Sequence, residues 1–262
     1  MNTEDVKLLV AERGLGFVGA ARTGDAKYGL DGPGSAETRQ AIAVFPPGME
    51  NREFFISGGG ATVTVTPLRH LVQALRENHP WALEALRGAA KDSPVENLSH
   101  FGLLCDPEAV ASELLELAAM HLSHYGMHIP PHTAGFGREA VVCLMKAFAC
   151  TGGAALAIRG IEYPTDVNLL LGALKRGNPL AVPVPYEAAA ALASFARGED
   201  SEGGAAGNPI CEVSSFIRAA RDEVKTLIRR GGGMGRLDTH FIDGAAEEAL
   251  RRIESSFTWE PS

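Results

Sequence analysis

The first third of the chain contains short runs rich in strand-forming residues, a pattern that indicates β-strands. In the stretch 62–66, threonine and valine alternate with the period of two expected for a strand with one buried face. Three successive glycines, Gly58 to Gly60, precede it and predict a hairpin turn. We therefore expect four strands in this region, at 16–20, 40–45, 53–57 and 62–66.

From residue 66 onward, apolar residues recur mainly at helical spacing. Thr66 and Pro67 predict the start of a helix that runs to residue 76, because threonine can cap a helix and proline suits its first position. Pro80 predicts the start of a second helix. Apolar residues at 110, 114 and 117 share a face with His121, which predicts an amphipathic helix over 108–121. Five more helices are expected, at 138–150, 165–175, 186–196, 211–230 and 243–256.

Together these patterns predict an α+β protein in two domains. A small mixed β-sheet domain is expected over residues 1–92, and a helical domain over residues 93–262. The sequence GEDSEGGAAGNP at 198–209 is rich in glycine and acidic residues, which predicts a flexible connector inside the helical domain.

Composition and charge narrow the class of protein. A net charge of −8 argues against a general nucleic-acid binder, although 218–236 forms one basic stretch, interpreted as a solvated helix face or a source of phosphate contacts. No apolar run approaches the roughly 20 residues needed to span a bilayer, and the acidic N-terminus lacks the features of a secretory signal. We expect a cytoplasmic protein that binds no membrane, with its four cysteines reduced.

Gly14, Gly16 and Gly19 match the spacing of the dinucleotide-binding fingerprint. That site needs a helix directly after the glycines, so that the ligand's pyrophosphate meets the helix N-terminus. Gly24 and Gly29 lie where this helix should run, so we expect no such site. The sequence also lacks Gly-x-Ser-x-Gly, His-Glu-x-x-His and Walker motifs, which argues against the commonest hydrolase and P-loop classes.

Four of the eight histidines lie within twelve residues. On a continuous helix, His121, His124 and His128 would share one face, which is the geometry of metal ligands at i, i+3 and i+7. Gly126 and the prolines at 130 and 131 instead predict that the helix ends first, leaving His128 and His132 on a loop. Two interpretations stay open: a metal site, or a polar helix end packed against the rest of the protein.

The stretch GDAKYGLDGPGSAETR at 24–39, followed by a strand and two prolines at 46–47, resembles a known family. It is similar to the predicted nucleotidyltransferases of the DNA-polymerase-β-like superfamily, in the branch associated with RNA repair. That family shows Gly-Ser-x-x-Tyr-Gly, a short turn with proline and serine, Asp-x-Asp, a hydrophobic strand and often two prolines. The residues in matching places are Tyr28, Gly29, Leu30, Pro33, Ser35, Pro46 and Pro47.

The resemblance continues downstream. PLRHL at 67–71, ENHP at 77–80 and ALEAL at 82–86 are similar to the family's Glu-Leu-Arg-Lys-Phe helix and its Asn-Pro…Leu-Glu-Leu-Leu segment. The resemblance implies a nucleotidyltransferase-like first domain. It implies nucleotide contacts from Gly24, Asp25, Lys27, Tyr28, Ser35 and Arg39.

The sequence departs from the family where its chemistry needs acids. In this fold, two carboxylates at i and i+2 of one strand hold the divalent metals that bridge the triphosphate and activate the attacking hydroxyl. Ala36 and Thr38 occupy those positions, and neither ligates Mg²⁺ in the usual way. Glu37 lies between them and is expected to point to the opposite face. The resemblance also implies a third carboxylate within 61–64, where the sequence has none.

Asp25 stands where the family has its phosphate-binding serine, and a carboxylate there would repel a triphosphate. We therefore expect a catalytically degenerate relative, a pseudoenzyme that binds a nucleotide, an RNA end or a protein partner. One alternative is an active enzyme that transfers a nucleoside monophosphate to RNA or protein, with Mg²⁺ held by Asp25, Asp31 and Glu37. The other is a structural module whose metal is held by the histidine cluster.

Overall fold

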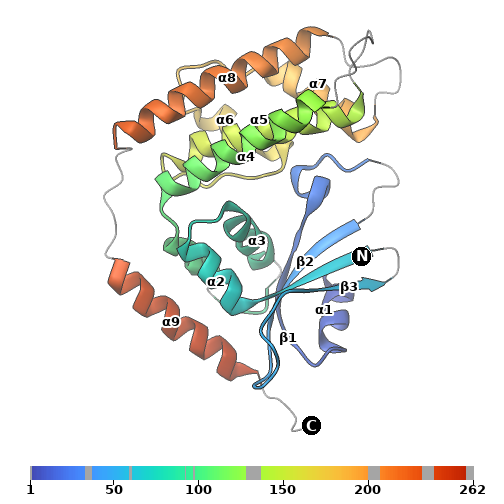
Figure 1. Ribbon diagram of the computed structural model, residues 1–262, viewed down its shortest axis with the longest axis vertical. Helices are drawn as coiled ribbons and strands as arrows, with labels where there is room; N and C mark the ends of the chain where they lie inside the picture. The colour runs from blue at the N-terminus through green and yellow to red at the C-terminus, as the bar shows by residue number, and fades with distance from the viewer. Residues whose placement is uncertain are drawn as a thin grey trace. The chain divides into compact units, whose positions relative to one another are not determined.

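The computed structural model describes residues 2–32, 37–58, 61–91, 93–96, 98–127, 137–199, 207–231 and 239–257. It shows an α+β protein with a small sheet near the N-terminus and helices through the rest of the chain, which confirms the predicted fold class (Figure 1). The chain separates into two compact units, each with its own core. The sheet unit comprises residues 1–24, 36–106 and 235–262, and the helical unit comprises residues 25–35 and 107–234.

The sheet unit contains a mixed four-stranded sheet in the order β1-β2-β4-β3. β1 runs antiparallel to β2, β2 runs parallel to β4, and β3 and β4 form an antiparallel hairpin. Each strand overlaps one of the four stretches predicted as strands. The bounds are β1 (Gly16–Arg22), β2 (Glu37–Val44), β3 (Phe54–Gly58) and β4 (Ala61–Pro67).

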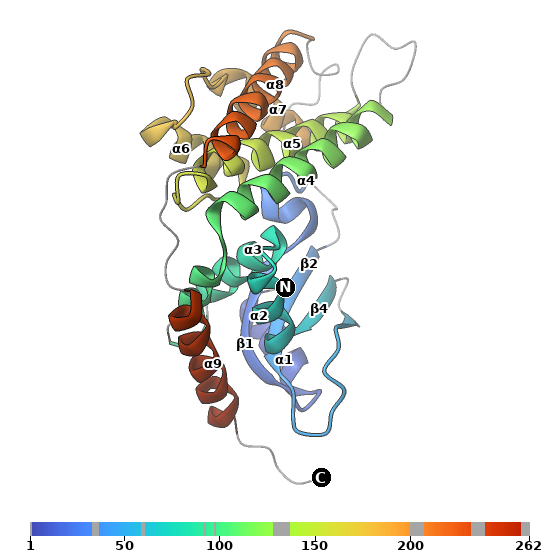
Figure 2. The ribbon, with the colours of Figure 1, turned by 60° about the vertical axis from the view of Figure 1, so that its left-hand side comes forward.

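Helices cover both faces of this sheet. α1 (Thr3–Ala11) lies against one face, and its buried Val6 and Val10 join the core formed by the apolar strand residues. α2 (Leu68–Arg76) and α3 (Pro80–Ala90) lie on the opposite side of the sheet (Figures 1 and 2). α3 approaches β1 closely because the residues between them are small: a Cβ atom at Gly19 would collide with Ala89.

The starts of these helices only partly follow the predictions. α3 begins at Pro80 as predicted, but α2 has Pro67 as its N-cap, and Thr66 makes side-chain contacts instead of capping the helix. α1 was not anticipated as a helix. It begins with a capping box, in which the side chains of Asn2 and Asp5 each accept a hydrogen bond from the other's backbone N–H.

The glycines at 14, 16 and 19 do not form a dinucleotide-binding loop. Gly14 adopts a left-handed backbone in the turn after α1, and Gly16 and Gly19 lie inside β1. The segment after β1 is the short 3₁₀ helix η1 (Gly24–Tyr28). The long helix that a pyrophosphate site requires is therefore missing directly after this motif, as expected.

The helical unit is built around α5, which is buried along nearly its whole length. Two glycines let neighbouring side chains approach α5 closely. A Cβ atom at Gly152 would lie 3.0 Å from Leu170, and one at Gly153 would lie 3.0 Å from Tyr163. The helices of this unit are α4 (Pro107–Met127), α5 (Arg138–Ala157), α6 (Val167–Gly177), α7 (Tyr186–Arg197) and α8 (Gly207–Arg229).

Among the residues that the structure describes, α5 is also long and apolar enough to cross a membrane by length and composition. Its apolar window is 89% buried inside the protein, as in a core helix.

The two units do not divide at the predicted boundary between residues 92 and 93. η2 (Leu98–Leu104) belongs to the sheet unit, and so does the C-terminal helix α9 (Thr239–Ser256). Arg76 of α2 forms ion pairs with Asp243 and Glu247 of α9, at 3.2 and 2.6 Å. α8 begins at Gly207, so the last three residues of the predicted connector at 198–209 are helical. Residues 200–206 of the predicted connector lie outside the described residues.

Candidate functional site

The residues implied by the resemblance fall in both units. The sheet unit contains Gly24, Thr38 and Arg39, and the helical unit contains Asp25, Lys27, Tyr28 and Asp31. Each unit therefore has a candidate site of its own. The predicted residues outside the described part of the chain are Ser35, Ala36, the Glu37 side chain, His128 and His132.

In the sheet unit, polar uncharged side chains line one face of two neighbouring parallel strands. Thr38 of β2 lies opposite Thr62 of β4, and Gln40 lies opposite Thr64. All four residues are half-buried, and we call them the threonine row. Adjacent strands are about 4.8 Å apart, so the Thr38 and Thr62 side chains are close neighbours. Thr38 is one of the positions at which the resemblance implies a metal-holding carboxylate, and its neighbour Thr62 lies within 61–64, where the resemblance implies another.

Gly24 lies against the start of the threonine row. Its φ angle of +60° is left-handed, and a Cβ atom at this position would lie 3.0 Å from Oγ1 of Thr38. The preceding residue, Thr23, donates its backbone N–H to the carbonyl of Thr38 at 3.3 Å. Both the backbone angle and the small space therefore favour glycine here. Arg39, the next residue of β2, is half-buried and lies opposite Arg22 of β1.

A carboxylate that the sequence analysis did not single out lies at the far end of the same face. Gln40 donates a hydrogen bond to the buried hydroxyl of Thr66 at 2.9 Å, and Thr66 donates to the carboxylate of Glu53 at 2.7 Å. Thr66 is four residues beyond Thr62 on β4, which is about 13 Å at the usual rise of a strand. Glu53 therefore does not replace the acids that are missing at Thr38 and Thr62.

In the helical unit, Asp25 is bound by a lysine from the core helix. Nζ of Lys146 on α5 lies 2.5 Å from the Asp25 carboxylate, and the Lys146 side chain is mostly buried. The Asp25 carboxylate is thus neutralised by a protein cation. Of the other two candidate acids, Asp31 is exposed and the Glu37 side chain is not described.

Tyr28 is the buried centre of this second site. Its ring centroid lies 4.8 Å from Nζ of Lys27 and 5.9 Å from Nζ of Lys146, and the His121 ring packs edge-on against it at 6.1 Å. Its hydroxyl is 3.8 Å from Sγ of Cys150. We call this set the Tyr28 cluster: Asp25, Lys27, Tyr28, His121, Lys146 and Cys150.

The environment of His121 does not suit a protonated imidazole. Burial, together with the positive charges of Lys146 and Lys27, lowers the pKa of His121 to about 4. His121 is therefore neutral near pH 7 and packs against an aromatic ring, while His124 on the same helix is exposed. Within the described ranges, no group of three or more histidine, cysteine, aspartate or glutamate side chains is placed to hold a metal ion.

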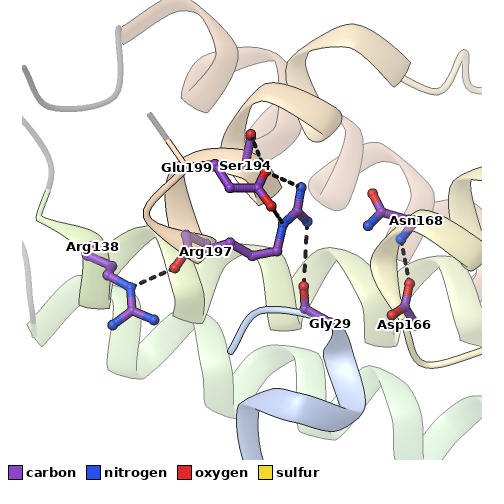
Figure 3. Close-up of polar contacts among 8 residues, drawn as sticks. Gly29, Arg138, Asp166, Asn168, Ser194, Arg197 and Glu199 are labelled. Carbon is purple, nitrogen blue, oxygen red and sulfur yellow. Dashed lines mark hydrogen bonds and ion pairs between the residues drawn. The ribbon is translucent and has the colours of Figure 1, made fainter. Parts of the chain in front are cut away.

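The segment after Tyr28 receives a polar contact from Arg197, the last residue of α7 (Figure 3). Arg197 donates to the carbonyl of Gly29 at 3.5 Å and forms an ion pair with Glu199 at 2.6 Å. Hydrogen bonds from Arg197 and Ser194 lower the pKa of Glu199 to about 2. Gly29 has a φ of +66°, and a Cβ atom there would collide with the carboxylate of Asp166.

No protein-family model matches this sequence, and a search of curated proteins finds no match either. The chemical properties of the two sites therefore rest on their residues. The threonine row offers hydroxyl and amide groups for hydrogen bonding, and the Tyr28 cluster offers two lysines around one carboxylate. Neither arrangement, as described, provides the pair of adjacent carboxylates that two-metal phosphoryl transfer requires.

Proposed function

We propose that this chain is a nucleotidyltransferase-like protein that does not transfer nucleotides and acts by binding a nucleotide, an RNA end or a protein partner. The observation that carries the proposal is the threonine row. Thr38 stands where the resemblance implies an acid, and the adjacent Thr62 is a neutral residue of the stretch 61–64, where it implies another. Mg²⁺ is held in such sites by carboxylate, phosphate and water oxygens, and neutral hydroxyls supply none of the negative charge.

The contacts of Asp25 support the same proposal. A triphosphate that approached this position would meet a carboxylate, and the nearby Lys146 is already paired with that carboxylate. The half-buried, neutral His121 adds no compensating positive charge. We also propose that the protein is cytoplasmic. In support, α5 is long and apolar enough to span a membrane, but it is buried inside the protein.

The direct test is nucleotide incorporation. Each of the four labelled nucleoside triphosphates is incubated with the protein, RNA or protein acceptors, and Mg²⁺ or Mn²⁺. We expect no incorporation above that of a heat-inactivated sample. Incorporation by the wild-type chain that disappears in Glu37→Ala would overturn the proposal, because it would show that a metal site has been rebuilt around that carboxylate.

A second test restores the missing charge. The double variant Thr38→Asp/Thr62→Asp places two carboxylates on neighbouring strands about 4.8 Å apart, close enough to share a divalent cation. We expect it to bind Mn²⁺ at least tenfold more tightly than wild type in calorimetric titration. The matched control, Thr38→Asn/Thr62→Asn, has the same size without the charge and should bind no better than wild type. Equal Mn²⁺ affinity in the two double variants would show that these positions are not a vacated metal site.

A further inference from the structure

The helix α8 carries a line of cations along one side. Arg218, Arg221, Lys225 and Arg229 are spaced by three, four and four residues, which places them on one side of a helix. We call these four residues the α8 stripe. From Arg218 to Arg229 it extends over eleven residue steps, or about 16 Å at the usual helical rise.

The stripe is largely open to solvent, whereas the apolar side of α8 is buried. Arg218, Lys225 and Arg229 are exposed, and Arg221 is half-buried. The apolar residues of α8 point into the helical unit, where α8 packs against α5 and α7 (Figure 1). The buried apolar side consists of Ile210, Val213, Phe216, Ile217, Ala220 and Val224.

Within the described chain, the four stripe residues have no counter-ion. None of them forms an ion pair within 4 Å with another described residue, and the buried Nε of Arg221 has no acceptor there. Two acids neighbour the stripe. Both oxygens of Glu223 accept the backbone N–H of Ala181, and the exposed carboxylate of Asp222, four residues after Arg218, offsets one of the four positive charges.

We propose that the α8 stripe binds the phosphodiester backbone of a nucleic-acid strand. Three of its four residues are arginines, whose planar guanidinium groups suit phosphate oxygens and remain charged. A chain with a net charge of −8 otherwise repels polyanions, so binding is confined to this side of α8 and depends on salt. A membrane surface fits less well, since a helix that lies in a bilayer inserts an apolar face and the apolar face of α8 is already buried.

This inference does not depend on the lack of catalysis. An enzyme that incorporated nucleotides would overturn the proposed function and leave the α8 stripe in place. Conversely, a failure of the α8 stripe to bind nucleic acid would overturn this inference and leave the argument from the threonine row unchanged. The contacts involve only the backbone, so little dependence on base sequence is expected.

The experiment measures binding of fluorescently labelled 20-nucleotide single strands, one RNA and one DNA of the same sequence, by anisotropy at increasing salt. We expect wild-type dissociation constants of about 10⁻⁶ to 10⁻⁴ M, and a plot of log K against log salt with a slope of about −3 for four phosphate contacts. Equal binding of the two strands identifies the shared phosphodiester backbone as the ligand. Tighter RNA binding adds a contact to the 2′-hydroxyl and still supports the stripe if the slope is kept.

The variant Arg218→Ser/Lys225→Ser/Arg229→Ser removes three exposed charges. We expect at least a tenfold loss of affinity at low salt and a slope reduced to about −1. The matched control, Arg159→Ser/Lys175→Ser/Arg176→Ser, removes three exposed cations from the same unit but from other places. It should keep the wild-type slope, and far-UV circular dichroism checks that both variants fold.

Three outcomes would overturn the inference. The first is the absence of wild-type binding to either strand at about 200 µM protein and low salt, which lies above the range expected for non-specific contacts. The second is an equal loss of affinity in the control variant, which would indicate a bulk effect of net charge. The third is tighter binding to phosphatidylcholine vesicles containing phosphatidylserine than to the oligonucleotides, which would make α8 a membrane-surface helix.

Discussion

Glycines at individual positions decide how closely backbone segments can approach in the helical unit. Gly29 is left-handed, with a φ of +66°, and its Cα faces the carboxylate of Asp166. Asp166 is also the N-cap of α6, where its side chain accepts the N–H groups of Asn168 and Leu169 at 2.9 and 3.1 Å. A side chain at residue 29 would therefore disturb a helix cap as well as its own backbone.

We predict that Gly29→Ala is more destabilising than Gly231→Ala. Gly231 has a similar φ of +71° but no atom within 4 Å of the added Cβ, so it serves as the matched control. Both variants should lose about 1 kcal/mol of unfolding free energy for the left-handed backbone. Gly29→Ala should lose about 1 kcal/mol more through the displaced Asp166 cap. Urea unfolding followed by circular dichroism measures the difference, and equal losses would show that Asp166 moves away without cost.

The sequence could predict some site residues but not their partners. The glycine pattern and Tyr28 stand out in the stretch 24–39 because left-handed turns and a buried aromatic residue leave local signals. The partners come from distant parts of the chain. Lys146 pairs with Asp25, and Arg197 contacts Gly29 across 168 residues. No spacing rule connects such residues, so only the folded chain reveals that the Asp25 charge is neutralised.

At the level of elements, the periodic segments were the predictable ones. The strand predicted at 62–66 alternates strictly and is present, and the apolar helix predicted at 138–150 is present and continues to Ala157. α1 was missed because its C-terminal part, residues 6–11 (VKLLVA), resembles a short apolar strand when taken alone. Its capping box at Asn2 and Asp5 was the available signal for a helix.

Apolar packing and ion pairs both attach α9 to the sheet unit. Leu250 and Ile253 are buried, and the Phe257 ring after the helix lies against Gly16 of β1. Arg76 reaches Asp243 and Glu247, and these two acids are about half exposed. Exposed ion pairs are weak, whereas removing a buried leucine side chain leaves a cavity.

We predict that Leu250→Ala destabilises the protein by about 2–4 kcal/mol and Arg76→Ala by about 1 kcal/mol or less. Hydrogen exchange of the α9 amides should accelerate strongly in the first variant and slightly in the second. Raising the salt concentration should weaken only the contribution of Arg76. A loss in Arg76→Ala that matches the loss in Leu250→Ala would mean that the ion pairs, rather than the apolar side chains, hold α9 in place.

At the level of the whole molecule, the order of segments along the chain does not reveal the two units. The change from alternating to helical patterns near residue 92 predicted a single boundary. The structure instead assigns 25–35 to the helical unit, although this segment joins two neighbouring strands of the sheet. It assigns α9, which follows all the helices of the other unit, to the sheet unit. Unit membership follows from long-range packing, which composition and periodicity do not encode.

The chain therefore passes between the two units four times, after residues 24, 35, 106 and 234. During synthesis, the strands and helices up to residue 106 emerge well before Phe257, the residue that covers Gly16. At about 5–20 residues per second, the ribosome needs roughly 8–30 s to add the intervening 151 residues. For that interval the nascent sheet unit exposes the apolar surface that α9 and Phe257 later cover, so slow codons within the helical segment should prolong its exposure to chaperones.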